Sequence, residues 1–175
     1  MSEARDDSGI WRKALFWSPF FVIVGSAIGY FSQSGFDNDW FANLVKPEFM
    51  PPGWAFGLAW TTLYTMLGIA LSTILNEPAS HQRSAALTYF WIQMVLNWLW
   101  SPIFFALHDM TLASVVLLIM LVIASIAAGK FYRIRKVAGL LMLPYLCWLI
   151  FATVLNTSYE RLNPGAGIDL LGSIF

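Results

Sequence analysis

The residues of this sequence that are best suited to do chemistry are tryptophans, tyrosines and asparagines that recur at helical spacing. Asn97, Trp100 and Phe104 lie at positions i, i+3 and i+7, which places them on one face of an α-helix. Trp60 and Tyr64 are four residues apart and share a face in the same way. Flat aromatic side chains combined with a few polar groups suit a large, flat, mostly apolar ligand. We therefore expect these faces to line a ligand pocket.

A third aromatic face occurs in the last apolar segment of the chain, where Tyr145 and Trp148 are three residues apart. Ala152 and Leu155 continue this face at helical spacing. A plainer alternative stays open, because the polar groups on these faces could simply form hydrogen bonds across helices. The predicted ligand contacts from all three faces are Trp60, Tyr64, Asn97, Trp100, Phe104, Tyr145, Trp148, Ala152 and Leu155.

Several kinds of chemistry have no residues to support them. The ten Lys and Arg residues are matched by ten Asp and Glu, so there is no basic excess for nucleic-acid binding. The single cysteine, Cys147, cannot form an intrachain disulfide or a cysteine-based metal site. No hydrolase or nucleotide-binding motif occurs. We expect no metal site, no required cofactor and no firm catalytic residue.

The elements that must position these faces follow from where the charges lie. Hydrophobic residues make up 58% of the chain, and the charged residues leave five long windows free of charge. A helix needs about 20 apolar residues to cross a bilayer, and a charge at its centre costs at least ~2.5–3.5 kcal/mol. A soluble bundle would need charged outward faces, which these windows lack. The sequence predicts an all-α integral membrane bundle of five transmembrane helices, at about 14–35, 53–76, 84–107, 110–130 and 137–160.

The basic residues predict the orientation of this bundle. Residues 1–13 form an N-terminal segment, 14–163 the membrane domain and 164–175 a C-terminal tail. Only Lys46 and Arg161 fall on one side of the membrane, and the other eight Lys and Arg residues fall on the opposite side. The positive-inside rule places the N-terminus in the cytoplasm and the C-terminus outside.

The loop of residues 37–52, between the first two predicted helices, is rich in proline. Proline fixes its own φ and restricts the residue before it, so we expect a stiff, largely extended segment. It could be a lid over the pocket, or an interfacial turn that anchors Trp40 and Trp54. The predicted lid residues are Trp40, Lys46, Pro47, Phe49, Pro51 and Pro52.

Five stretches of this sequence resemble the TspO/MBR family of tryptophan-rich sensory proteins and mitochondrial translocator proteins. They are 46–54 (KPEFMPPGW), 59–64 (AWTTLY), 96–105 (LNWLWSPIFF), and the pair 143–148 (LPYLCW) and 152–156 (ATVLN). The resemblance covers roughly residues 20–163. Two departures stand out: Phe49 occupies a position where many members have tryptophan, and Thr157 and Ser158 intervene before Tyr159.

The resemblance implies a five-helix bundle, commonly a homodimer, with one pocket under the loop that joins helices 1 and 2. Its members bind tetrapyrroles such as protoporphyrin IX and haem, and the animal proteins also bind cholesterol. Carried over, the pocket tryptophans correspond to Trp60 and Trp148, with Asn97 and Trp100 beside them. The chain resembles the bacterial members of the family, which implies a location in the bacterial cell membrane. A sterol-like lipid is therefore only a secondary candidate partner.

Three functions are compatible with the resemblance. The leading hypothesis is a receptor or carrier that binds tetrapyrroles and transports or senses them. The first alternative is a light- and oxygen-dependent porphyrin-degrading enzyme, in which Trp60 and Trp148 would be redox-active. The second is a sensory or scaffold protein whose ligand changes its interaction with a partner.

Overall fold

The computed structural model describes residues 8–168 and 170, and within these residues it contains only helices and the loops that connect them. The predicted all-α class is confirmed. The helices are α1 (Ser8–Phe31), α2 (Asp39–Asn43), α3 (Gly53–Leu75), α4 (His81–Ser101), the π-helix η1 (Pro102–Ala106), α5 (Met110–Ile134), α6 (Lys136–Leu141) and α7 (Leu143–Leu162).

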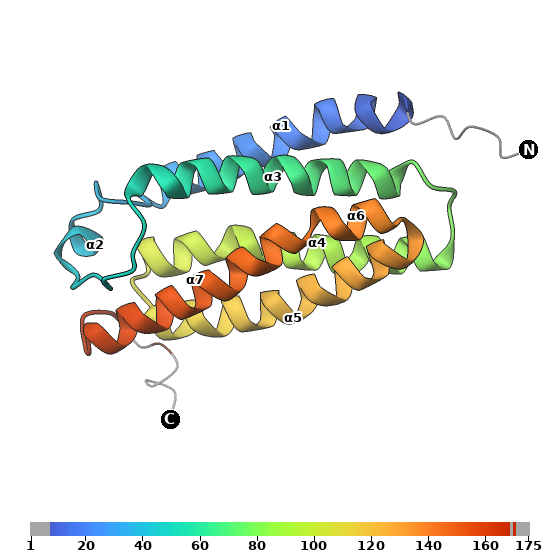
Figure 1. Cartoon of the computed structure of the whole chain (residues 1–175). Coiled ribbons are helices and arrows are strands. Elements are labelled where there is room, and N and C mark those ends of the chain that lie inside the picture. The colour runs from blue at the N-terminus through green and yellow to red at the C-terminus, as the bar shows by residue number, and fades with distance from the viewer. Residues whose placement is uncertain (1–7, 169, 171–175) are drawn as a thin grey trace, which may run out of the picture.

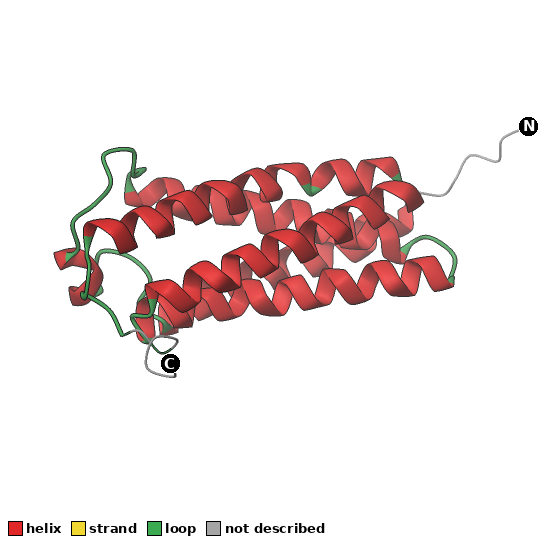
Figure 2. Cartoon of the chain, turned by 90° about the horizontal axis from the view of Figure 1, so that it is seen from below, coloured by secondary structure: helices red, strands yellow, loops and turns green. Residues whose placement is uncertain are grey.

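The long helices lie side by side in one elongated bundle, with the short α2 at one end (Figure 1). Helix α1 packs on α3, α3 on α6, α5 on α6 and α7, and α4 on α5 and α1, so the helices form a closed ring. Figure 2 shows the same arrangement from below. We call the end that holds α2 and residues 32–52 the lid end. Helix α1 begins at the opposite end, and α7 finishes at the lid end.

Side-chain caps fix the starts of three helices. The side-chain oxygen of Ser80 accepts a hydrogen bond from the Arg83 N–H, which begins α4. Asp109 caps α5 in the same way through the Leu112 N–H, and Asn38 caps α2. These caps satisfy N–H groups that have no partner within their own helix. Helix α3 begins after Pro52 without a side-chain cap, and the proline ring fixes the φ of that residue at −63°.

Two prolines mark breaks in the bundle, though not in the same manner. Pro102 ends the regular α4 and begins η1, where the Leu107 N–H donates to the Pro102 carbonyl at 2.9 Å. Proline has no N–H for the regular ladder. Pro144 lies in the first turn of α7, directly after a break at Met142 that separates α6 from α7.

The predicted helix bounds differ from the observed ones for a physical reason. A charge-free window measures the apolar span, whereas a helix continues past it into polar surroundings. Helix α1 therefore includes Arg12 and Lys13. It ends at Phe31 rather than at residue 35, because Gln33 has a positive φ of 52°, which an α-helix does not allow. The loop predicted to be extended contains α2. Residues 1–7 of the predicted N-terminal segment, and residues 169 and 171–175 of the predicted tail, lie outside the described residues.

Four helical segments of the described chain are long and apolar enough to cross a membrane. They are Ser8–Phe31, Gly53–Leu75, Met110–Ile134 and Lys136–Leu162. Helix α4, the fifth long helix, is more polar, and its Gln93 and Asn97 are buried in the bundle. The outward surface carries exposed Leu15, Ile23, Leu118 and Val122. Such an apolar exterior is typical of helices that face lipid.

Candidate functional site: an aromatic cavity at the lid end

A cavity of about 420 Å³ lies inside the helix ring at the lid end. Its size is in the range of ordinary ligand sites, roughly 300–1,000 Å³. No charged side chain of the described chain lines it. Every predicted ligand contact except Tyr145 lies in its wall, namely Trp60, Tyr64, Asn97, Trp100, Phe104, Trp148, Ala152 and Leu155.

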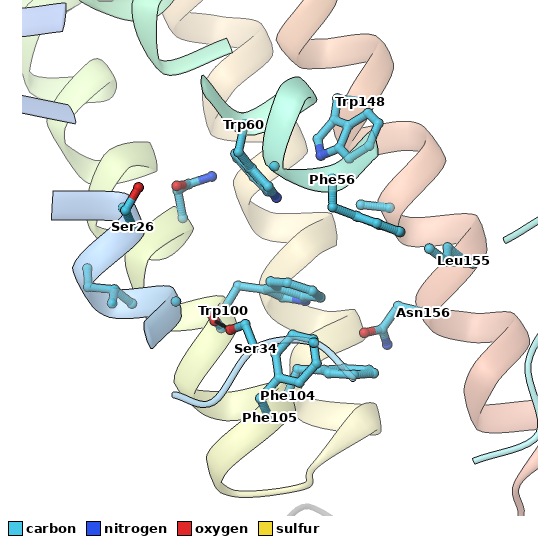
Figure 3. A pocket seen from close by; sticks show the side chains of 18 of the residues that line it. Ser26, Ser34, Phe56, Trp60, Trp100, Phe104, Phe105, Trp148, Leu155 and Asn156 are labelled. Carbon is cyan, nitrogen blue, oxygen red and sulfur yellow. Dashed lines mark hydrogen bonds between the residues drawn. The ribbon is translucent and has the colours of Figure 1, made fainter. Parts of the chain in front are cut away.

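Trp60 from α3 and Trp148 from α7 form one side of the cavity (Figure 3). Their ring centroids are 6.2 Å apart and their planes meet at 80°, an edge-to-face contact. Trp60 also stacks on Tyr64 at 5.2 Å, and Phe56 contacts the Trp148 ring at 5.8 Å. Because each indole is held by a neighbouring ring, this wall is ordered before any ligand arrives.

Trp100 and the phenylalanines of η1 form the opposite side. The Trp100 and Phe104 rings stack at 5.3 Å with an interplanar angle of 22°. Phe104 packs against Phe105 at 4.9 Å. Asn156 on α7 faces this group across the cavity, as Figure 3 shows. The π-helix after Pro102 thus brings both phenylalanines to the lid end beside Trp100.

Asn97 lines the cavity, but both ends of its amide are already engaged. The Tyr64 hydroxyl donates to Asn97 Oδ1 at 2.7 Å, and Asn97 Nδ2 donates to the Tyr145 hydroxyl at 3.1 Å. Tyr145 in turn donates to Met120 Sδ at 3.3 Å. Tyr145 is fully buried behind the cavity wall rather than in it. This chain of hydrogen bonds connects four helices and holds the aromatic wall in place.

None of the six predicted lid residues lines the cavity. Lys46 Nζ donates to the carbonyls of Phe41, Ala42 and Leu44, at 2.7–3.2 Å, and so caps the C-terminus of α2. The Trp40 ring stacks on His108 at 4.4 Å, and its Nε1 donates to the Ala166 carbonyl. These residues belong to the lid but lie on its side away from the cavity. The lid residues that do face the cavity are Ser34, Gly35, Phe36, Phe41 and Met50.

The lid is attached to the bundle at several points. Asn38 Nδ2 donates to the Phe105 carbonyl at 2.9 Å, which ties the start of α2 to η1. Ser34 and Ser101 share a hydrogen bond of 2.5 Å between their hydroxyl oxygens. The Tyr159 hydroxyl donates to Met50 Sδ at 2.7 Å. The lid is therefore closed over the cavity.

Helix α1 contributes one wall of the site that was not predicted from the sequence. Gly25, Ser26 and Gly29 of α1 line the cavity. The small-residue spacing of Gly25 and Gly29 was the available signal, since it permits close approach to a helix surface. A Cβ on Gly25 would collide with the Tyr64 ring. Phe56 was also missed, although it lies four residues before Trp60 on the same helical face.

The described residues offer little to a metal ion. Within them, no group of three or more His, Cys, Asp and Glu side chains gathers closely enough to hold one. The cavity instead offers aromatic faces, two amides and several hydroxyls. Fold and site together define a helical membrane protein with an internal aromatic cavity.

Comparison with known proteins assigns this arrangement to a family. The TspO/MBR family profile matches residues 17–162, and the chain belongs to this family. It is 40% identical over 142 residues to the tryptophan-rich protein TspO of Archaeoglobus fulgidus, covering 81% of this chain and 91% of that protein. It is 36% identical over 126 residues to the tryptophan-rich sensory protein of Cereibacter sphaeroides (72% and 78%). It is 37% identical over 128 residues to the human translocator protein (72% and 76%).

Proposed function

We propose that the protein is a membrane receptor or carrier that binds protoporphyrin IX, haem and similar flat apolar ligands in the aromatic cavity. The observation that carries this proposal is the pairing of Trp60 and Trp148 in a wall free of charged side chains. A tetrapyrrole has a broad aromatic face, and indole rings contribute both contact area and favourable ring–ring geometry. The names of the relatives refer to sensing and translocation, which agrees with a ligand-handling role.

The test is a titration of the detergent-solubilised protein with protoporphyrin IX, followed by Soret absorbance. We expect the double variant Trp60→Phe with Trp148→Phe to lower the affinity severalfold, because phenylalanine keeps an aromatic face but a smaller one, and a whole aromatic contact contributes ~0.5–1.5 kcal/mol. Trp54→Phe is the matched control, since Trp54 is 71% exposed and lies outside the cavity wall. Unchanged affinity in the double variant would show that the ligand binds elsewhere.

One observation also supports the enzymatic alternative. Both oxidisable indoles, Trp60 and Trp148, face the same cavity and contact one another. A porphyrin excited by light in the presence of oxygen would lie against both rings. Illumination of the bound complex separates the two functions. Bleaching of the Soret band faster than for free porphyrin, and slowed in the double variant, supports degradation, whereas equal bleaching supports binding alone.

The placement in the membrane is part of the same proposal. We infer a bacterial cell membrane location with the N-terminus in the cytoplasm, because Lys13, Arg83 and Arg135 belong to the end of the bundle opposite the lid. The lid and the cavity would then lie toward the outer surface. The homodimer and the tetrapyrrole partner implied by the resemblance belong to this proposal as well.

A further inference from the structure

Asn156 contributes an unpaired hydrogen-bond acceptor to the cavity. The residue is 2% exposed and lines the cavity from α7. Its Nδ2 donates to the Met110 carbonyl at 2.9 Å and to Ser114 Oγ at 2.7 Å. Its Oδ1 has no hydrogen-bond partner. Among the described residues that line the cavity, this oxygen is the only buried side-chain acceptor left unpaired.

The orientation of this amide is fixed by its neighbours. The Met110 carbonyl can only accept, so the nitrogen of Asn156 must face it. Glu160, one turn along α7, accepts from the Thr111 hydroxyl at 2.6 Å and, more weakly, from the Ser114 hydroxyl at 3.4 Å. Because Ser114 directs its proton to Glu160, its oxygen is available to accept from Asn156. The amide oxygen is thereby turned toward Trp100 and the phenylalanines, as Figure 3 shows.

A buried acceptor without a partner is costly, and native folds leave few of them. A ligand that donates a hydrogen bond to Asn156 Oδ1 removes this cost, whereas a ligand without a donor preserves it. The same cavity also holds two unpaired donors, the indole N–H groups of Trp98 and Trp100. The cavity therefore favours a ligand that both donates and accepts hydrogen bonds.

We propose that Asn156 is a specificity-determining residue, which selects flat aromatic ligands that carry a ring N–H over ligands of the same shape that lack one. This inference rests on the proposed function, since it concerns the same cavity. The favoured class is the aromatic nitrogen heterocycle whose pyrrole-type N–H points outward from the ring. The N–H groups of protoporphyrin IX point into the macrocycle and haem has none, so the binding of these tetrapyrroles does not use this hydrogen bond. Trp98 and Trp100 would meet an acceptor elsewhere on the ligand.

The test compares two nearly isosteric fluorescent probes, carbazole with a ring N–H and fluorene with a CH₂ in its place. Both are titrated against the detergent-solubilised full chain. We expect the wild-type protein to bind carbazole about tenfold more tightly, the effect of satisfying one buried acceptor. Asn156→Leu should abolish the preference, because leucine fills a similar volume without an acceptor. Thr153→Val is the matched control, since Thr153 lies on α7 outside the cavity wall and its hydroxyl donates to the Leu149 carbonyl.

Three results would overturn the proposal: no binding of carbazole, equal affinities for both probes in the wild type, or a preference that survives Asn156→Leu. The wild-type comparison decides the matter if Asn156→Leu does not fold. A parallel titration with protoporphyrin IX separates this inference from the proposed function. Protoporphyrin binding without a carbazole preference refutes the role of Asn156 alone. A carbazole preference without protoporphyrin binding refutes the tetrapyrrole assignment alone.

Discussion

Asn163, at the end of α7, forms a pair of hydrogen bonds with the backbone of Val45 in the lid. The Val45 N–H donates to Asn163 Oδ1 at 2.7 Å, and Asn163 Nδ2 donates to the Val45 carbonyl at 2.9 Å. One side chain thus satisfies both backbone polar groups of a residue 118 positions earlier in the chain. Because Val45 lies two residues after the end of α2, this contact fastens the lid to the helix that carries Trp148.

Replacing this amide should loosen the lid. We expect Asn163→Ala to raise the dissociation rate of bound protoporphyrin IX about five- to tenfold, since two hydrogen bonds worth ~0.5–1.5 kcal/mol each are lost. Stopped-flow recovery of tryptophan fluorescence measures this rate. Asn43→Ala is the control, because Asn43 bonds only to the Asp39 carbonyl within α2. Equal rates in wild type and Asn163→Ala would mean that ligand exchange does not pass the lid.

The hydroxyl of Tyr145 should matter for stability more than for binding. Tyr145→Phe leaves Asn97 Nδ2 without its partner, at a cost of about 0.6–2 kcal/mol in the free energy of unfolding. Since Tyr145 lies behind the cavity wall, protoporphyrin affinity should change less than in Trp148→Phe. Unfolding in detergent and Soret titration give the two quantities. A larger loss of affinity than in Trp148→Phe would place Tyr145 in direct contact with the ligand.

Gly25 is predicted to be essential for the packing of α1 on α3. A methyl group at Gly25 would overlap the Tyr64 ring, so Gly25→Ala must displace Tyr64 and weaken its hydrogen bond to Asn97. We expect a loss of about 1–3 kcal/mol in unfolding free energy, the usual cost of overpacking. Gly129→Ala is the control, because nothing lies within 4 Å of its Cβ position. That substitution should be neutral or stabilising by up to ~1 kcal/mol. Equal effects of the two substitutions would contradict the described contact.

These residues also show what the sequence could and could not predict. The faces of Trp60, Trp100 and Trp148 were predictable, because helical periodicity assigns residues to faces without knowledge of the packing. The role of Tyr145 was not, since it shares a helical face with Trp148 and only the neighbouring α5 decides which of the two is covered. Periodicity assigns residues to the faces of one helix, but it carries no information about how deeply a second helix buries them.

The lid illustrates a second limit. The prolines of the lid predicted a stiff segment but not a helix. The short α2 depends on the Asn38 cap and on the hydrogen bonds from Lys46 to three backbone carbonyls. The contacts that close the lid, such as Asn163 with Val45, join residues far apart in sequence. No local pattern in a single sequence marks such a pair.

The charge distribution predicts the orientation of the bundle. A reporter enzyme that is active only outside the cytoplasm should be active when fused after α7 and inactive when fused in the loop between α3 and α4. The physical reason is that eight of the ten Lys and Arg residues fall on the side of that loop. The reverse pattern of activity would invert the assignment and place the lid on the cytoplasmic side.

The central claim is that one flat tetrapyrrole occupies the cavity whose wall contains Trp60 and Trp148. The most direct measurement is an equilibrium titration of the purified wild-type protein with protoporphyrin IX, with the Soret band recorded at each addition. We predict a saturable shift of the band that ends at one porphyrin per chain. A signal that rises without saturation, in proportion to the amount of detergent present, would contradict the account.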